Sequence, residues 1–311
     1  MNDDVVVSVL CTAYNHEKYI RSALDGFVNQ KTNFRYEVLI NDDASTDNTA
    51  AIIAEYEAKY PDIIKPVYQT ENQYSKGVHI FQTILFPLAK GKYIAVCEGD
   101  DYWCDENKLQ KQVDFLESHE GYAACVHNTR LMDCRTGGSW PMYKRNKDQD
   151  LPFKEVVNYS AACFHTSSVT CSRELFIVPD ALTAEGFGDY PLAVYLRLNG
   201  KIHYLKDIMS VYRMVTAGSW TARNQNKASK QQRICGQKAR TDFTEKLRRY
   251  CREKGVAPEY QKAVNDVANR DQLQLTVLQK GGRCLLHGPQ LGAFMGLSLE
   301  KKIHVLDAVW T

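Results

Sequence analysis

Short apolar runs and longer amphipathic segments alternate along the first hundred residues. Runs of this kind are typical of buried parallel strands, and segments with apolar residues every three to four positions are typical of helices. We predict strands at 5–11, 36–41, 64–69 and 92–97, and helices at 17–30, 50–60 and 78–89 between them. This alternation predicts an α/β fold, with a Rossmann-like, mostly parallel sheet flanked by helices.

The pattern becomes less regular after residue 103. We predict helices at 108–118, 189–199 and about 259–280, strands at 121–132 and 201–205, further strands within 160–178, and a mostly helical stretch at 223–254. The segment 134–150 is polar and rich in turn-forming residues. We therefore divide the chain into a first half-domain at 1–125, a second at 126–222 and a helical C-terminal extension at 223–311.

Composition narrows the class of protein. The chain has 311 residues, 44% of them hydrophobic, which is enough for a sizeable core, and its net charge of +2 gives no case for nucleic-acid binding. Its ten cysteines form no C-x-x-C pair, so we expect reduced structural thiols and a cytoplasmic location. Neither a secretory leader nor an apolar run of the roughly 18–20 residues needed to span a bilayer is expected.

Two acidic clusters follow two of the predicted strands. Asp42 and Asp43 come after the strand at 36–41, and Glu98, Asp100 and Asp101 come after the strand at 92–97. Ligands of open parallel sheets bind beyond the carboxyl ends of the strands, where these carboxylates would repel one another without a cation. A divalent metal holding the phosphates of a nucleotide meets that need.

Simpler interpretations of the same residues stay open. The second cluster could be an exposed acidic turn in which Asp101 caps the next helix. Asp42 and Asp43 could be solvated beside a helix that begins near Ser45. Tyr14 ends the first strand, where it could stack on a base or be an ordinary edge aromatic.

An ordered set of motifs over about residues 5–220 resembles family 2 glycosyltransferases, which are inverting enzymes of the GT-A fold. The motifs are Val-Ser-Val-Leu-Cys-Thr-Ala-Tyr-Asn, Asn-Asp-Asp-Ala-Ser-Thr-Asp, the loop from Asn72 to Gly77, and Gly91-Lys92-Tyr93-Ile94 leading into Glu98-Gly99-Asp100-Asp101-Tyr102-Trp103. The nearest similarity is to bacterial enzymes of capsule, lipopolysaccharide or exopolysaccharide assembly. The resemblance implies a nucleotide-sugar donor.

The resemblance also implies roles for individual residues. Contacts to the nucleotide-sugar would come from Thr12, Ala13, Tyr14, Asn15, Asp42, Asp43, Glu98, Asp100, Arg213 and Trp220. Asp101 and Asp100 would hold Mn²⁺ or Mg²⁺. Glu98 stands where relatives more often have Asp, which leaves its own contact open.

A catalytic base is implied by Gly186-Phe187-Gly188-Asp189-Tyr190, where Asp189 would take the proton of the acceptor hydroxyl. The alternative is that Asp189 only caps the helix at 189–199. Downstream, Tyr212-Arg213 and Gly218-Ser219-Trp220 resemble a flap over the donor, although Val215 occupies a place where many relatives have His. Arg213 could neutralise the leaving phosphate or form a structural ion pair, and Trp220 could cover a sugar or pack in the core. His165 is a candidate for the acceptor pocket or a structural residue.

The stretch 223–254 carries eleven basic and three acidic residues, a net charge of +8. It is either a solvated helical face or a surface through which 223–311 contacts an anionic membrane on its cytoplasmic side. We predict an inverting, metal-dependent glycosyltransferase that moves a sugar from a nucleotide-sugar to a glycan or lipid-linked glycan. Among nucleotide-sugars, a UDP-sugar is the preferred donor. The alternative is an inactive nucleotide-sugar-binding scaffold, encouraged by Val215. The oligomeric state stays open.

A phosphotransfer receiver domain is disfavoured because the first strand ends without an acidic pair. A sugar nucleotidyltransferase is disfavoured because residues 11–18 contain no glycine-rich loop for a triphosphate.

Overall fold

The computed structural model describes residues 4–158, 163–183, 189–214, 229–281, 285, 289–297 and 302. Contacts divide the chain into two compact units. The first unit comprises 1–151, 160–177 and 199–222, and the second comprises 152–159, 178–198 and 223–311. The predicted boundary after residue 125 falls inside a strand, β6 (Tyr122–Asp133).

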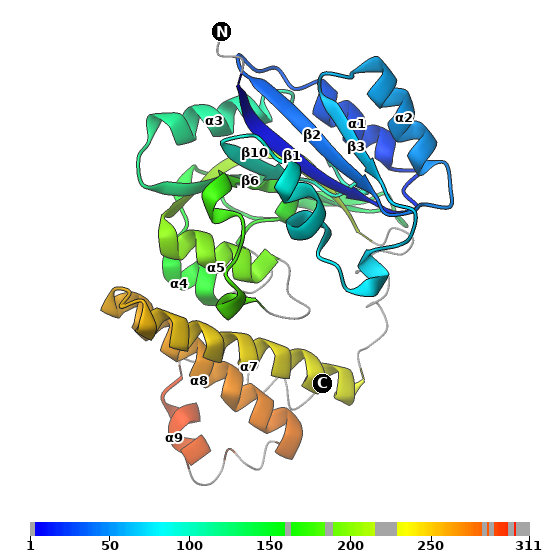
Figure 1. The fold of residues 1–311 in the computed structure, drawn as a ribbon. Helices are drawn as coiled ribbons and strands as arrows, with labels where there is room; N and C mark the ends of the chain where they lie inside the picture. Colours follow the sequence, from blue (N-terminus) through cyan, green and yellow to red (C-terminus); the bar gives the residue numbers. More distant parts are fainter. Residues whose placement is uncertain are drawn as a thin grey trace. The chain divides into compact units, whose positions relative to one another are not determined.

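The first unit is built on one curled sheet, in which β1 to β3 lie side by side (Figure 1). Its main strands, in spatial order, are β3 (Ile64–Tyr68), β2 (Arg35–Asp42), β1 (Val5–Ala13), β4 (Tyr93–Val96), β9 (Thr170–Ser172), β6, β10 (Lys201–Met214) and β5 (Tyr102–Trp103). The pairs β3–β2, β2–β1, β1–β4 and β6–β10 are parallel, whereas β9 and β5 pair antiparallel with their neighbours. The predicted mostly parallel α/β sheet is confirmed.

Two small strands extend this sheet. β7 (Ser139–Pro141) pairs with β6, and β8 (Gln149–Asp150) pairs with β10. Both lie in the stretch for which the sequence predicted only turns. Strand β10 is much longer than the predicted 201–205, because it continues past two register shifts to Met214 beside β6.

Three α-helices lie among the described residues of the first unit: α1 (Ile20–Val28), α2 (Thr49–Lys59) and α3 (Lys108–Ser118). The face of α1 that carries Ile20, Leu24 and Phe27 is buried in the core, as its apolar spacing predicts. Short helical turns cover Tyr74–Lys76, Thr166–Ser168 and Arg173–Leu175.

One prediction for this unit is wrong and another is confirmed only in part. The helix expected at 78–89 is a wide single turn at Ile80–Leu85 followed by a 3₁₀ turn at Phe86–Leu88. Pro87 lacks a backbone donor and its ring clashes with a helical carbonyl four residues earlier, which prevents a regular helix here. The strands expected over 160–178 reduce to β9 among the described residues, because two 3₁₀ turns flank it.

A glycine fixes the approach to β4. A Cβ atom on Gly91 would lie 2.4 Å from the backbone nitrogen of Ser8 on β1, so no other residue fits without a shift. Ser8 Oγ donates to Glu37 Oε1 at 2.7 Å and accepts the Gly91 N–H at 2.8 Å. These contacts set the register in which β1, β2 and β4 end together.

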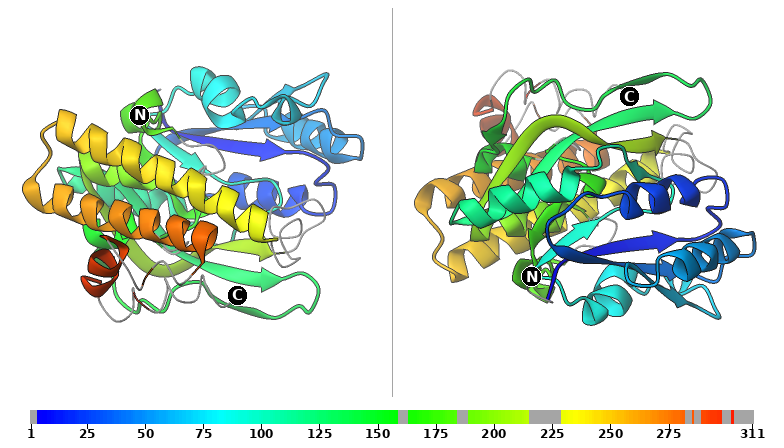
Figure 2. Two further views of the ribbon diagram at one scale, coloured as in Figure 1. Left: turned by 90° about the horizontal axis from the view of Figure 1, so that it is seen from below. Right: turned by 90° about the horizontal axis from the view of Figure 1, so that it is seen from above.

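The second unit is helical. It contains α4 (Phe153–Asn158), α5 (Asp189–Asn199), α7 (Lys230–Glu253), α8 (Pro258–Lys280) and α9 (Pro289–Met295), with a 3₁₀ turn at Asp180–Leu182. Helices α7 and α8 run side by side as an antiparallel hairpin (Figure 2). Ser229 and Gln232 form a capping box at the start of α7. The helices predicted at 189–199 and 259–280 are confirmed.

The cysteines of the described residues, nine in number, are free thiols, and six of them are buried. Within the same residues, none of the helices combines the length and apolar character that crossing a bilayer requires.

Candidate active site

The carboxyl ends of β1, β2 and β4 meet at one edge of the sheet. Ala13 is paired with Asp42 across β1 and β2, and the N–H of Asp43 donates to the Ala13 carbonyl at 2.9 Å. On the other side of β1, the N–H of Gly99 donates to the Thr12 carbonyl at 2.9 Å. The two acidic clusters, separated by more than fifty residues in sequence, therefore flank the end of the same strand.

Gly99 is required for this close approach. A Cβ atom at this position would lie 2.8 Å from Ile20 Cδ1, 3.0 Å from His16 Nδ1 and 3.1 Å from the Thr12 carbonyl oxygen. The absence of a side chain lets the 98–101 loop lie against the loop that follows β1.

Asp42 and Asp43 are both buried, but their side chains have different partners. Asp43 accepts the N–H groups of Gln73 at 2.8 Å and Tyr74 at 3.0 Å, so both of its carboxylate oxygens hold the loop beyond β3. Asp42 accepts only the Ser45 N–H, at 3.2 Å on Oδ2, and its buried Oδ1 has no hydrogen-bond partner. Asp42 therefore keeps an acceptor for a ligand, whereas Asp43 holds the neighbouring loop in place.

The loop after β1 is held by Asn15. This residue has a left-handed φ of 55°, and its side-chain oxygen accepts the Thr46 N–H at 2.8 Å. Its own N–H donates to Ser45 Oγ at 2.9 Å. Asn15 thus joins the ends of β1 and β2, while the Tyr14 ring next to it is 43% exposed and accessible to a ligand.

Asp101 is a buried carboxylate close in sequence to two other acidic residues, Asp100 and Glu98. It is only 2% exposed, and burial, followed by the charges of Asp100 and Glu98, raises its pKa well above the usual range. The Arg213 N–H donates to Asp101 Oδ1 at 2.9 Å and opposes this rise. A cation placed here would relieve the repulsion.

Arg213 connects β10 to the acidic loop. Its Nη1 donates to the Asp100 carbonyl at 2.8 Å, and its guanidinium lies 4.4 Å from the centroid of the Tyr102 ring. Arg213 therefore fixes the shape of the 100–102 turn in addition to placing positive charge beside it. Val215, Gly218, Ser219 and Trp220 lie outside the described residues, as do Gly186, Phe187 and Gly188.

His165 lies next to Asp101. Its Nε2 is 4.0 Å from Asp101 Oδ2, and its Nδ1 is 2.8 Å from Ser167 Oγ. Burial lowers the pKa of His165 to about 4, so the ring is neutral at physiological pH. The indole N–H of Trp103 donates to the Ser167 carbonyl at 2.9 Å, which anchors the turn that carries His165.

His16 was missed by the sequence interpretation. Its Nδ1 is buried without a hydrogen-bond partner, and burial lowers its pKa although the carboxylates of Asp100, Asp47 and Asp42 act in the opposite direction. The signal that could have identified His16 is its position directly after Asn15, in the loop that leaves β1.

Asp189 is the first residue of α5 in the second unit. Within the described part of the chain, no group of three or more His, Cys, Asp or Glu side chains is arranged to hold a metal ion. The donors available at the strand ends are the carboxylates of Asp100, Asp101 and Glu98, which are hard oxygen ligands.

The family model "Glycosyl transferase family 2" matches residues 8–176, which include β1, β2, β4 and both acidic clusters. The chain belongs to glycosyl transferase family 2. An uncharacterized protein of Mycobacterium tuberculosis is 37% identical over 217 residues, covering 69% of this chain and 60% of that protein. The chain thus spans less than two thirds of the length of this relative.

Other members of the family have named activities. The Escherichia coli enzyme named UDP-Glc:alpha-D-GlcNAc-diphosphoundecaprenol beta-1,3-glucosyltransferase is 33% identical over 115 residues, 37% of this chain and 43% of its own. Staphylococcus aureus TarS 1–349, solved with UDP-GlcNAc, matches 98% of this chain and 82% of its own, with a TM-score of 0.60 and 20% identity.

A mannosyltransferase of Pyrobaculum calidifontis, solved with GDP-Man and Mn²⁺, covers 99% of this chain and 85% of its own, with a TM-score of 0.59 and 16% identity. At such identities these two structures establish the fold. The GT-A architecture expected from the motifs is confirmed.

Proposed function

We propose that this family 2 glycosyltransferase is a metal-dependent, inverting enzyme that uses a UDP-sugar donor and glycosylates a hydroxyl group of a glycan or lipid-linked glycan. The observation that carries the proposal is Asp101, a buried carboxylate whose pKa is raised by burial and by the charges of Asp100 and Glu98. Such an arrangement costs free energy until a cation enters. The donor class is supported by the Escherichia coli relative, whose name gives UDP-Glc, and by TarS, which was solved with UDP-GlcNAc. The diphosphoundecaprenol in the name of the Escherichia coli relative supports a lipid-linked glycan as acceptor.

In this proposal the ends of β1 and β2 hold the nucleoside. Asp42 Oδ1, the buried acceptor without a partner, receives an N–H of the base, and uracil offers one. Tyr14 flanks the ring, and Thr12 and Ala13 supply backbone contacts. Asn15 and Asp43 act by holding the surrounding loops in place, and Glu98 lies at the sugar or diphosphate side.

The carboxylate oxygens of Asp100 and Asp101 are the type of ligand that divalent ions such as Mg²⁺ and Mn²⁺ prefer. Mg²⁺ and Mn²⁺ are commonly bound by one or two carboxylates together with substrate phosphate oxygens. Asp101 and Asp100 would hold the ion, which would neutralise the charge that develops on the leaving diphosphate. Arg213 adds a second positive charge at the same turn.

In an inverting transfer a single carboxylate takes the proton of the acceptor hydroxyl. We assign this role to Asp189. As its carboxylate accepts the proton, the hydroxyl oxygen forms a bond to the anomeric carbon and the bond from that carbon to the diphosphate oxygen breaks. The electron pair leaves with the nucleoside diphosphate, so no covalent enzyme intermediate forms. Trp220 would cover the sugar, and 223–311 would bring the enzyme to a membrane that carries a lipid-linked acceptor.

The test is a donor screen with the full chain. Thermal unfolding is measured with UDP-glucose, UDP-GlcNAc, UDP-galactose and GDP-mannose, each with and without Mn²⁺, and release of the nucleoside diphosphate is followed in parallel. We expect a UDP-sugar to raise the melting temperature only when Mn²⁺ is present, because a ligand that binds the folded state stabilises it by mass action.

Two variants complete this test. Asp189→Asn should bind the donor normally yet lose transfer, and Asp62→Asn, an exposed aspartate outside the site, should change neither. Normal turnover by Asp189→Asn would reassign the base. Binding of a donor without any turnover would favour the inactive scaffold.

A further inference from the structure

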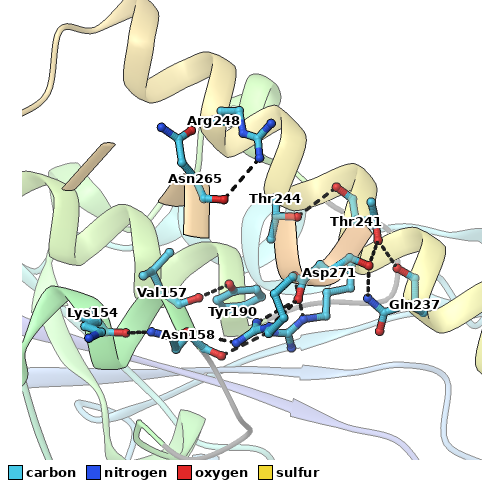
Figure 3. A network of polar contacts seen from close by, with 12 residues as sticks. Lys154, Val157, Asn158, Tyr190, Gln237, Thr241, Thr244, Arg248, Asn265 and Asp271 are labelled. Carbon is cyan, nitrogen blue, oxygen red and sulfur yellow. Dashed lines mark hydrogen bonds and ion pairs between the residues drawn. The ribbon is translucent and has the colours of Figure 1, made fainter. Parts of the chain in front are cut away.

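The second unit contains a buried carboxylate with a complete set of partners. Asp271 on α8 is 0% exposed. Figure 3 shows Asp271 within a network of polar contacts. Its Oδ2 accepts a hydrogen bond from Nε of Arg240 at 3.0 Å, and its Oδ1 accepts hydrogen bonds from Nε and Nη2 of Arg270 at 3.0 and 2.8 Å. Gln237 Nε2 donates to the backbone carbonyl of Asp271 at 3.0 Å. We call Arg240, Asp271 and Arg270 the arginine–aspartate cluster.

Both arginines extend the cluster to the end of α4. Arg270 Nη1 donates to Asn158 Oδ1 at 3.0 Å, and Arg240 Nη2 donates to the Asn158 carbonyl at 3.2 Å. Asn158 is the last residue of α4, where helical carbonyls have no partner inside the helix. Cations are favoured at such an end by the helix dipole, so the cluster holds α4 from its C-terminal side.

Helix α4 in turn holds the start of α5. The hydroxyl of Tyr190 donates to the Val157 carbonyl at 2.6 Å, and the Tyr190 side chain is fully buried. Its ring meets Phe243 of α7 edge-on, with the centroids 4.9 Å apart, and lies 5.5 Å from the Arg240 guanidinium. Tyr190 is the second residue of α5 and directly follows Asp189.

A buried ion cluster is weak evidence for stability, because well-packed apolar residues of similar size often stabilise as much. What an ion cluster of this kind supplies is fixed geometry, since the planar guanidinium group of arginine donates its hydrogen bonds in fixed directions. A general base needs such control, because a misplacement of about 1 Å can cost about 100-fold in rate. These contacts determine where the peptide that carries Asp189 lies within the second unit.

We propose that the arginine–aspartate cluster, acting through Asn158 and Tyr190, positions Asp189 for proton abstraction. Tyr190, Asn158, Arg240, Asp271 and Arg270 are then positioning residues, and the C-terminal hairpin α7–α8 serves the chemical step. This inference rests on the proposed role of Asp189.

The first experiment compares two variants, each of which loses one buried hydrogen bond from a tyrosine hydroxyl to a backbone carbonyl. Tyr190→Phe loses the bond to the Val157 carbonyl. Tyr36→Phe loses an equivalent buried bond, to the Phe27 carbonyl at 2.8 Å, in the first unit. With the UDP-sugar that the wild type turns over and Mn²⁺, we expect Tyr190→Phe to lower kcat about tenfold with KM for the donor unchanged.

Tyr36→Phe should leave both constants at their wild-type values while lowering the melting temperature by a similar amount. Equal kcat values for the two variants would overturn the proposal, because the loss would then follow stability alone.

The second experiment replaces the cluster with apolar residues in the triple variant Arg240→Leu, Asp271→Leu, Arg270→Met. Such replacements commonly preserve folding. We expect thermal unfolding and UDP affinity near those of the wild type but a kcat reduced at least tenfold. A wild-type kcat in a folded triple variant would overturn the proposal.

Asp189→Asn distinguishes failure of the proposed base from failure of the proposed positioning role. If it turns over donor normally, the proposed base is wrong. If it is inactive while Tyr190→Phe and the triple variant retain full kcat, only the positioning role is wrong.

Discussion

Two aspartates, one in each unit, are equally hidden from solvent but have opposite surroundings. Asp271 receives three hydrogen bonds from two arginine side chains. Asp101 receives one backbone N–H from Arg213 and faces Asp100 and Glu98. Removing a charge from water costs several kcal/mol unless partners replace the lost solvation. Asp271 has those partners within the protein, and Asp101 has few of them.

Asp271 has the surroundings of a structural charge, and Asp101 has those of a functional one. A carboxylate that the fold needs is satisfied by the fold, as Asp271 is. A carboxylate buried in acidic surroundings destabilises the protein by itself, so its presence there points to a partner that arrives from outside. Substitution of the two aspartates should therefore have opposite effects on stability.

Asp271→Asn should destabilise the protein by about 3–5 kcal/mol, because the buried Arg270 and the partly buried Arg240 would lose their counter-charge. Urea unfolding followed by circular dichroism measures this loss. Asp266→Asn is the matched control, since Asp266 lies on the same helix in an exposed ion pair with Lys262, and it should change stability by less than about 1 kcal/mol. Equal losses in both variants would contradict the assigned role of the cluster.

Asp101→Asn should abolish the Mn²⁺-dependent release of UDP, with a loss of about 1000-fold, while the metal-free protein stays as stable as the wild type or becomes more stable. The gain is expected because the variant removes like-charge repulsion from a buried site. The measurement pairs a turnover assay with thermal unfolding in EDTA. A large fall in the melting temperature without metal would show that Asp101 is needed for the fold itself.

The sequence predicted the first four strands and the meeting of the acidic clusters, because the first depends on local alternation along the chain and the second on the shared carboxyl ends of parallel strands. It favoured Asp42 over Asp43 as the contact to the base, but it could not show what Asp43 holds instead. These neighbours have the same chemistry, and only the loop at 73–74, thirty residues away, takes up both oxygens of Asp43. Contacts over such separations leave no trace in a single sequence.

The role of the C-terminal segment was also beyond the sequence. The count of basic residues in 223–254 predicted a charged outer face, yet Arg240 turns inward to Asp271. A helical period shows which residues share a face, but it does not show which basic residue meets a buried acid on another helix. For the same reason the sequence did not predict that Lys108 is buried, because its helical period indicated only an amphipathic helix at 108–118.

Lys108 offers a third buried charge for the comparison. It is fully buried on α3, its Nζ donates to Gln112 Oε1 at 2.7 Å, and it lies 4.0 Å from the centroid of the Trp103 ring. None of the ion pairs found in the described part of the chain includes it. Burial lowers its pKa to about 7.

This pKa predicts how stability depends on pH. Between about pH 7 and 10 the unfolded chain keeps the Lys108 proton that the folded protein has lost, so the contribution of Lys108 to stability rises with pH, by at most about 1.4 kcal/mol per unit. Lys108→Met should therefore be more stable than the wild type at pH 6, with a gap that narrows by pH 9. Urea unfolding at pH 6, 7, 8 and 9 measures it. A constant gap would mean that Lys108 does not titrate in this range.

Asp42→Asn should lower the affinity for UDP about tenfold, because one unpaired acceptor in the pocket is lost and a donor takes its place. Isothermal titration with UDP and Mn²⁺ measures the change, and Asp62→Asn serves as the exposed control. The affinity for Mn²⁺ alone should not change. If UDP binds the variant as tightly as the wild type, the base is recognised elsewhere.

His165 should have the smallest effect, because it is a neutral group 4.0 Å from the Asp101 carboxylate. His165→Leu removes the polar neighbour of Asp101 and should raise the Mn²⁺ concentration for half-maximal UDP release about three- to fivefold. His165→Gln keeps an N–H at a similar reach and should stay within about twofold of the wild type. Titration of Mn²⁺ followed by the paramagnetic signal of the free ion supplies a readout that does not depend on turnover. Identical Mn²⁺ binding by the Leu and Gln variants would mean that Asp101 keeps its position without His165, and that the backbone N–H of Arg213 alone orients it.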